Sequence, residues 1–325
     1  MLETPILFIV FNKTDTTRLV FAKIREQKPA QLFIAADGPR AEKIGEADKC
    51  STVRSWVLDN IDWDCEVKTL FREQNVGCGR GPSEAITWFF EHVEEGIILE
   101  DDCLPNQTFF MFCSELLEKY RSSDAISIIS GNNFQPIQPM ELDSDYYYSI
   151  FPSSNGWATW RRTWQGFDLK ISGWPATNKK SLARYLFREP QYASWWINYL
   201  EWIYTTQPTD MWDFQFHCHC MLKNQLAVIP KANLISNIGY GPDATHSQDP
   251  NNYFANLPRY NLTFPLRHPR IMKRNYQADV FIQTNLFGHI EQTNLVKKGK
   301  RFLKKFYLTI IKRVKVSILL LIHFD

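Results

Sequence analysis

Short strand-like runs alternate with amphipathic helical patterns over the first hundred residues. The runs cover 6–11, 32–36, 66–71 and 97–99. Between the first two, Leu19, Val20 and Ile24 recur at helical spacing after a start at Thr14 or Asp15. Strands that alternate with helices, and are themselves apolar, are typical of a parallel sheet covered on both faces. The pattern therefore predicts an α/β fold with a mostly parallel sheet.

The segment 75–82 is rich in glycine and lies before a helix that we expect to begin at Ser83. It lacks the full spacing of a dinucleotide-binding fingerprint, and it has no Walker lysine. Glycines here let the backbone pass close either to a ligand or to another strand, and the pattern does not decide between the two. Later patterns predict helices over 109–120 and 194–203, and a strand at 227–230 that continues into 233–235.

Three carboxylates, Glu100, Asp101 and Asp102, end the fourth strand-like run. Ionised carboxylates are not buried without a partner, and a cation is the simplest partner for several of them. Hard divalent cations prefer oxygen ligands and often bridge carboxylates to phosphate oxygens. The run therefore predicts a metal at the carboxyl end of a strand, where open α/β sheets bind ligands. In the alternative interpretation, Asp102 only caps the helix that follows Pro105.

Composition limits the class of protein. A chain of 325 residues with 44% apolar and 14% aromatic residues can bury a large core and is not disordered. Seven cysteines without a signal peptide indicate reduced thiols in a cytoplasmic protein. Residues 297–325 carry a net charge of +8, which leaves −6 on the rest of the chain. An acidic body does not favour nucleic-acid binding.

The basic segment 297–325 has the pattern of an amphipathic helix. Leu303, Ile310 and Val314 share one face, and lysines and arginines gather on the other. This pattern predicts an interfacial helix on an anionic membrane surface, and its apolar part is too short to span a bilayer. We expect a peripheral protein on the inner face of the cell membrane. The alternative is a helix docked on the body with a solvated basic face.

The second half offers three candidate site residues. Most of its tryptophans belong to the core, but the turn before Trp157 suggests a pocket mouth, where an indole can carry a sugar ring. Asp213 stands among aromatic residues, which suits a proton acceptor with a raised pKa, although a helix-capping role fits equally well. His246 ends a polar loop and is either a third metal ligand or a solvent-facing side chain. The run 217–220 lacks the second ligand pair of a zinc site.

Taken together, these motifs resemble those of the GT-A glycosyltransferases, over about residues 3–250. The resemblance is closest to the N-acetylglucosaminyltransferase I type branch and its bacterial relatives. It rests on segments at 11–13, 36–38, 99–102, 155–162 and 233–246.

The resemblance implies a role for each matching residue. Phe11, Asn12 and Lys13 would contact the donor, with Lys13 where the family often has arginine. Asp37 would accept a hydrogen bond from the base, expected to be uracil, and Glu100 and Asp101 would lie near the ribose or base. The remaining implied roles are metal ligation of Mn²⁺ or Mg²⁺ by Asp102 and His246, proton abstraction by Asp213, and an acceptor platform at Trp157.

The function expected from this resemblance is metal-dependent transfer of a hexosyl or N-acetylhexosaminyl group from a UDP-sugar. The acceptor would be a glycan or lipid-linked glycan in bacterial surface polysaccharide synthesis. A sugar-nucleotide pyrophosphorylase is an alternative, although its glycine-rich signature is missing between Val10 and Arg18. A non-catalytic nucleotide-sugar-binding protein is another.

The expected organisation is a catalytic domain with two halves, followed by an extension and the basic helix. The boundaries are 1–104 and 105–250 for the halves, 251–296 for an irregular extension and 297–325 for the helix.

Overall fold

The computed structural model describes residues 1–241, 249 and 253–287. The chain forms two compact units, Met1–Asp279 and Val280–Asp325. His246 and the basic segment 297–325 lie outside the described residues, so the interpretations placed on them stay predictions, as do the expected domain boundaries.

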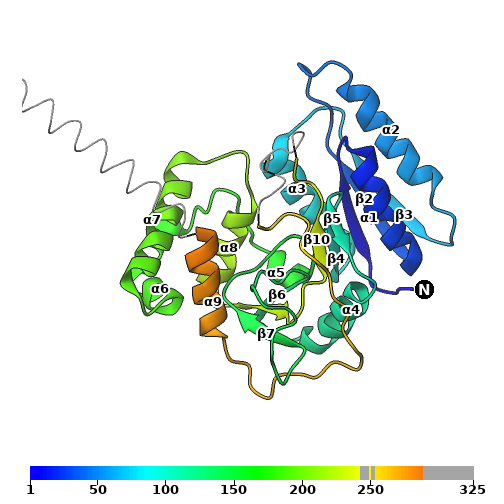
Figure 1. The fold of residues 1–325 in the computed structure, drawn as a ribbon. Helices are drawn as coiled ribbons and strands as arrows, with labels where there is room; N and C mark the ends of the chain where they lie inside the picture. Colours follow the sequence, from blue (N-terminus) through cyan, green and yellow to red (C-terminus); the bar gives the residue numbers. More distant parts are fainter. Residues whose placement is uncertain (242–248, 250–252, 288–325) are drawn as a thin grey trace, which may run out of the picture. The chain divides into compact units, whose positions relative to one another are not determined.

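Within the described chain, eight strands form one sheet in the order β3-β2-β1-β4-β8-β6-β9-β7 (Figure 1). Six of them run in the same direction, and β8 and β7 run against it. The strands are β1 (Ile6–Val10), β2 (Gln31–Ala36), β3 (Glu66–Phe71), β4 (Glu95–Glu100), β6 (Ile126–Ser130), β7 (Tyr146–Ser149), β8 (Trp157–Trp160) and β9 (Leu226–Pro230). The predicted α/β fold with a mostly parallel sheet is confirmed.

Two further strands, β5 (Cys103–Pro105) and β10 (Ile235–Asn237), pair with each other in a small antiparallel sheet. The sequence pattern suggested that 233–235 continues the strand before it. That prediction is wrong, because Ile235 pairs with Pro105 and β10 thereby leaves the main sheet. The consequence is a short ladder directly after the acidic run, which joins two segments about 130 residues apart in the sequence.

Helices cover both faces of the sheet. They are α1 (Thr14–Gln27), α2 (Glu46–Asp59), α3 (Gly77–His92), α4 (Phe109–Tyr120), α5 (Arg161–Trp164), α6 (Lys179–Leu186), α7 (Pro190–Thr206), α8 (Asp213–Leu222) and α9 (Tyr276–Ile282). None of the helices in the described ranges has the length and apolarity needed to cross a membrane.

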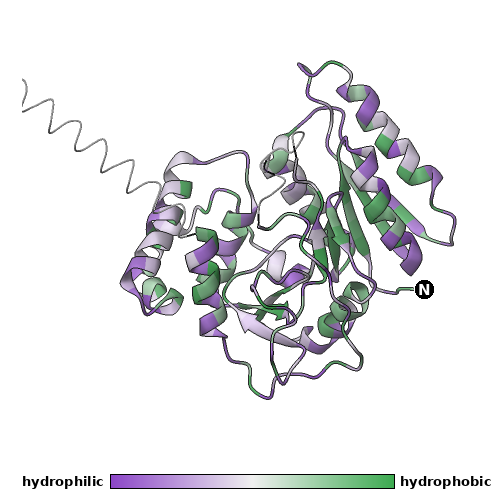
Figure 2. Cartoon of the chain, viewed as in Figure 1, coloured by the Kyte–Doolittle hydropathy of each residue, from purple (hydrophilic) through white to green (hydrophobic). Residues whose placement is uncertain are grey.

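The pleat of β1 divides the core into two clusters. Ile6 and Phe8 join the cluster that contains α1, α2 and α4, whereas Leu7 joins the cluster that contains α3 and α8. Successive residues of a strand point to opposite faces, so one apolar strand supplies both clusters. Figure 2 shows the central strands as mainly hydrophobic and the outer helices as mixed. This pattern explains why β1 is apolar throughout.

Two local predictions need correction. Leu19 was expected to face inward but is 54% exposed, whereas Val20 and Ile24 are buried. The helix expected to begin at Ser83 begins at Gly77. The carboxylate of Asp37, which directly follows β2, supports this earlier start.

Asp145 fastens the segment after residue 253 to the sheet. Its carboxylate is 1% exposed and pairs with Lys231 at 2.6 Å and Arg267 at 3.0 Å. Burial would raise its pKa, but hydrogen bonds from Arg267 and Lys231 outweigh burial and lower the pKa to about 2. Such a group stabilises the fold above its unfolded pKa of about 3.9, and this contribution disappears as the pH falls through the folded value.

We therefore expect Asp145→Asn to lower the free energy of unfolding at pH 7 by about 2–4 kcal/mol, since it leaves two cations without their buried partner. Urea unfolding at several pH values would measure this, and the variant should also lose part of the fall in stability between about pH 4 and pH 2. The exposed Asp62, paired with Arg25, offers a matched control. Asp62→Asn should change little, and equal effects of the two substitutions would contradict the interpretation.

Candidate functional site

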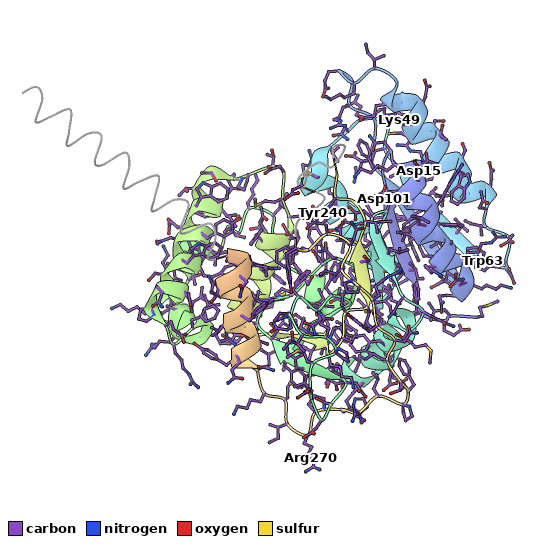
Figure 3. The ribbon with its side chains drawn as sticks, in the orientation of Figure 1. Asp15, Lys49, Trp63, Asp101, Tyr240 and Arg270 are labelled. Carbon is purple, nitrogen blue, oxygen red and sulfur yellow. The ribbon has the colours of Figure 1, made fainter. Side chains whose placement is uncertain are left out.

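The carboxyl ends of β1, β2 and β4 meet at one edge of the sheet. Val10 pairs with Ala36 across β1 and β2, and Ile9 pairs with Glu100 across β1 and β4. The residues that follow these strands are therefore neighbours, although they come from three separate parts of the sequence. Asp101, labelled in Figure 3, stands at this edge. Edges of this kind are where open α/β sheets bind ligands.

The acidic run at the end of β4 concentrates negative charge in a partly exposed position. Burial raises the pKa of Glu100 to about 8, with further contributions from the charges of Asp102, Asp101 and Asp213. Burial and the charge of Asp102 raise the pKa of Asp101 to about 7. The pKa of Asp102 is also raised by burial. Three adjacent carboxylates in this environment favour the approach of a cation, which would stabilise their ionised forms.

Asp101 connects this run to the turn after β1. Its carboxylate accepts a hydrogen bond from the backbone amide of Phe11 at 3.0 Å. Lys13 follows at the first position before α1, and its positive charge favours the ionised forms of Asp101 and Asp102. The structure thus brings together four of the predicted site residues, namely Phe11, Lys13, Asp101 and Asp102. Asp101 has a backbone partner that the sequence pattern did not indicate.

Asp102 lies against the segment that follows β10. Its backbone carbonyl accepts a hydrogen bond from Ile238 N at 2.9 Å. A Cβ atom on Gly239 would lie 2.2 Å from Asp102 Oδ2, so only glycine leaves room for the carboxylate. Tyr240, labelled with Asp101 in Figure 3, comes from this segment. Gly239, which lies against Asp102, stands seven positions before His246 in the sequence.

Asp102 does not cap the next helix. Helix α4 begins at Phe109, and Asn106 Oδ1 accepts hydrogen bonds from the amides of Thr108 and Phe109. The capping interpretation of Asp102 is therefore wrong. Asn106 performs the role that the sequence pattern offered to Asp102, because it stands three residues before the first helical residue.

Asp37, after β2, holds the start of α3. Its carboxylate accepts hydrogen bonds from the backbone amides of Gly38 at 2.8 Å, Val76 at 3.0 Å and Gly77 at 3.1 Å. The first amides of a helix lack partners within the helix, and a carboxylate there also interacts favourably with the helix dipole. This explains why α3 begins at Gly77. The predicted contact of Asp37 with a base stays a prediction.

Asn12 is held by a buried carboxylate, Glu46, which the sequence did not suggest as its partner. Its side-chain amide donates to Glu46 Oε1 at 2.9 Å, and Glu46 is 5% exposed and paired with Arg40. The hydrogen bond from Arg40 lowers the pKa of Glu46 to about 2. The Arg40 guanidinium also lies 5.6 Å from the centre of the Phe11 ring. No local pattern links Glu46 to Asn12, because the two residues are 34 positions apart.

Asp213 reaches the same site from the second half of the chain. It is the first residue of α8, and its charge contributes to the raised pKa of Glu100. The preceding segment lies against α3: Cys78 Sγ donates to the backbone carbonyl of Asp210 at 3.2 Å. A Cβ atom on Gly79 would lie 2.5 Å from the Thr209 carbonyl oxygen. The glycine-rich segment thus admits another backbone, and this contact brings Asp213 toward the acidic run.

Trp157 does not form an exposed platform. It is fully buried in β8, where it pairs with Ile98 and packs on Trp212 and Phe216. The prediction that Trp157 lies at the mouth of a pocket and carries an acceptor sugar is therefore wrong. The turn before it is present, but the indole enters the core cluster between the sheet and α8.

Within the ranges that the structure describes, no three His, Cys, Asp or Glu side chains form a metal-binding group. Mg²⁺ and similar ions often take one or two carboxylates from the protein and complete their coordination with substrate phosphates and water. The donor set around Asp102, with its raised pKa and the space left by Gly239, fits a divalent ion held in that way.

No known family model matches the chain, and no curated protein matches it. Among solved structures, the chain is similar to a mannosyltransferase from Pyrobaculum calidifontis in complex with GDP-Man and Mn²⁺, at 15% identity and a TM-score of 0.34. It is similar to TarS from S. aureus at 11% identity and a TM-score of 0.34. It is also similar to an apo UDP-glucose pyrophosphorylase at 8% identity and a TM-score of 0.32.

The match to the mannosyltransferase covers 49% of this chain and 45% of that protein. The match to TarS covers 49% of this chain and 47% of TarS. The match to the pyrophosphorylase covers 71% of this chain and 93% of that protein. The chain therefore spans about half the length of the first two proteins.

Proposed function

We propose that this protein transfers a glycosyl group from a nucleotide-diphosphate sugar, expected to be a UDP-sugar, to a hydroxyl group of a glycan or lipid-linked glycan. One observation carries the proposal. The end of β4 presents three carboxylates with raised pKa values, beside Lys13 and within reach of the charge of Asp213. This combination of charges suits a diphosphate held with a cation at the edge of the sheet.

Asp102 would hold the divalent ion, with donor phosphate oxygens and water as further ligands, and His246 is the candidate for an additional ligand. When bound, Mn²⁺ or Mg²⁺ would neutralise the diphosphate and stabilise the charge that develops as the nucleoside diphosphate leaves. Lys13 would add a fixed positive charge for the same phosphates. Asp37 and Asp101 would line the base and ribose side of the donor, while Phe11 and Asn12 would form the adjacent wall.

Asp213 would act as the general base. In inverting transfer, the acceptor oxygen forms a bond to the anomeric carbon while the bond from that carbon to the phosphate oxygen breaks. The electron pair leaves with the nucleoside diphosphate, and the hydroxyl proton passes to the Asp213 carboxylate. Asp213 is the first residue of α8, and its charge acts on Glu100 at the proposed donor site, which is compatible with this role.

The basic segment 297–325 supports a further part of the proposal, attachment to an anionic membrane surface beside lipid-linked acceptors. This segment contains nine basic residues and one acid. Each basic residue near an anionic surface contributes about 1 kcal/mol.

The first test concerns the metal. Asp102→Ala removes the proposed ligand, so we expect calorimetry to show that Mn²⁺ no longer strengthens UDP binding, whereas the thermal unfolding temperature stays close to that of the unaltered chain. If Mn²⁺ leaves UDP affinity unchanged in both proteins, the metal proposal fails.

Gly239→Ala tests the same site without removing a ligand. The added Cβ would collide with Asp102 Oδ2, so Mn²⁺-dependent UDP binding should weaken by about 10- to 100-fold. Gly173 has no atom within 4 Å of a built Cβ, so Gly173→Ala is the matched control and should bind normally.

The second test concerns the base. Asp213→Asn keeps the shape of the side chain and removes its proton acceptor, so turnover should fall by about 10²–10⁴-fold while UDP binding is retained. Asp210→Asn, three residues earlier and exposed, is the control and should turn over normally. If only Asp210→Asn loses turnover, Asp210 is the base and the proposal for Asp213 fails.

The same measurements distinguish the reaction classes. A transferase releases UDP slowly from a UDP-sugar in the presence of Mn²⁺ and without acceptor. A pyrophosphorylase would instead need pyrophosphate, and a non-catalytic protein would bind UDP without releasing product. A thermal-shift panel of nucleotide sugars would identify the donor.

The third test concerns the membrane. Full-length protein should bind vesicles that contain phosphatidylglycerol at low salt, and high salt should weaken this binding by screening. Removal of residues 297–325 should abolish vesicle binding while UDP binding is retained, which serves as the control for an intact body. Full-length protein that ignores such vesicles at low salt would contradict the proposal.

A further inference from the structure

Helix α7 carries three aromatic rings in a continuous stack. Trp195, Tyr199 and Trp202 are separated by four and three positions, which places them on one face of the helix. Trp195 and Tyr199 are 4.9 Å apart between ring centres at an angle of 16°, and Tyr199 and Trp202 are 5.5 Å apart at 21°. We call these three residues the α7 stack. Stacked, near-parallel rings cover one another's inner faces, so the outer face of the last ring is the one that a ligand can use.

The α7 stack becomes more exposed toward its C-terminal end. Trp195 is 8% exposed, Tyr199 is intermediate, and Trp202 is 43% exposed. Trp202 ends the stack, so one of its ring faces is turned away from Tyr199. Tryptophan usually contributes a large buried area, and an exposed indole supported by a rigid stack is therefore a candidate binding surface.

The α7 stack contacts the residue next to the proposed general base, Asp213. The Tyr199 ring meets Phe214 edge to face, at 4.9 Å and 71°, and Phe214 directly follows Asp213. Burial raises the pKa of Tyr199, and the nearby charges of Asp213 and Asp210 raise it further. The chemistry around the α7 stack is therefore aromatic and acidic, and it lies beside the residue that would accept the proton.

We propose that the α7 stack binds a pyranose ring of the acceptor glycan, with Trp202 as the outer platform; this rests on the proposed function. The apolar C–H face of a pyranose packs well on the flat face of an indole. The neighbouring carboxylates favour a neutral ligand rich in hydroxyl groups over an anionic membrane surface, which would be repelled by them. The platform that the sequence suggested at Trp157 is thereby assigned to Trp202.

The test measures binding of three soluble probes, cellohexaose, N-acetylchitohexaose and galactohexaose, to the full-length chain with UDP and Mn²⁺ present. Saturation-transfer NMR would show which probe binds. We expect at least one to bind, and Trp202→Ala to weaken it by about 3- to 10-fold, as for the loss of one aromatic stacking contact. Trp202→Phe keeps a flat ring and should restore most of the affinity. Ile271→Ala, a change at another exposed apolar residue, should bind normally.

Two results would overturn the inference that the α7 stack binds the acceptor glycan. Absence of binding by all three probes, or equal binding by the full-length chain and Trp202→Ala, overturns the inference. If Trp202→Ala loses affinity for phosphatidylglycerol vesicles but not for the probes, the α7 stack is a membrane contact and the inference also fails. Failure of the proposed function is separate, because it would appear as no UDP release from any UDP-sugar by the full-length chain, whatever the probes do.

Discussion

The accumulation of negative charge at the end of β4 is the constraint on which the candidate site depends. Glu100 is the last residue of the buried strand β4, and Asp101 and Asp102 follow it, so their carboxylates stand where water only partly solvates them. Adjacent charges in such a position repel one another and raise their pKa values. The backbone amide of Phe11 and the positive charge of Lys13 stabilise the ionised form of Asp101, but they offset only part of the repulsion between the carboxylates. The remaining charge is the physical reason to expect a cation.

Several residues at this edge of the sheet also hold the backbone in place. Asp37 supports the first turn of α3, Asp101 supports the turn after β1, and Asn12 is held by Glu46. These hydrogen bonds orient the side chains before a ligand binds, so less conformational entropy is lost on binding. A substitution at Asp37 or Asp101 would therefore disturb both the contact with a donor and the local backbone. Asp102 separates these effects better, since Asn106 and not Asp102 accepts the hydrogen bonds at the start of α4.

Two close backbone approaches bring distant segments into the site. Gly239 leaves room for the carboxylate of Asp102, and Gly79 leaves room for the carbonyl of Thr209. Through the second contact, α8 and its first residue Asp213 come from more than 100 positions beyond the acidic run. The same helix pair, α7 with α8, exposes an aromatic stack beside Asp213. Under the proposed function, the donor side would come mainly from the first half of the chain and the acceptor side from the second.

The sequence by itself determined where the strands of the first half lie, their carboxyl ends to within one residue, and the acidic run. These features depend on local signals, namely apolar runs, helical spacing and consecutive charges, which act over a few residues. Tertiary structure alone decided that Trp157 is buried and Trp202 exposed, because the exposure of an indole depends on which helix covers it. It also decided the start of α3 and the pairing of β10 with β5. Their partners, Asp37 and Cys103–Pro105, are about 40 and 130 residues away, beyond the reach of any local pattern.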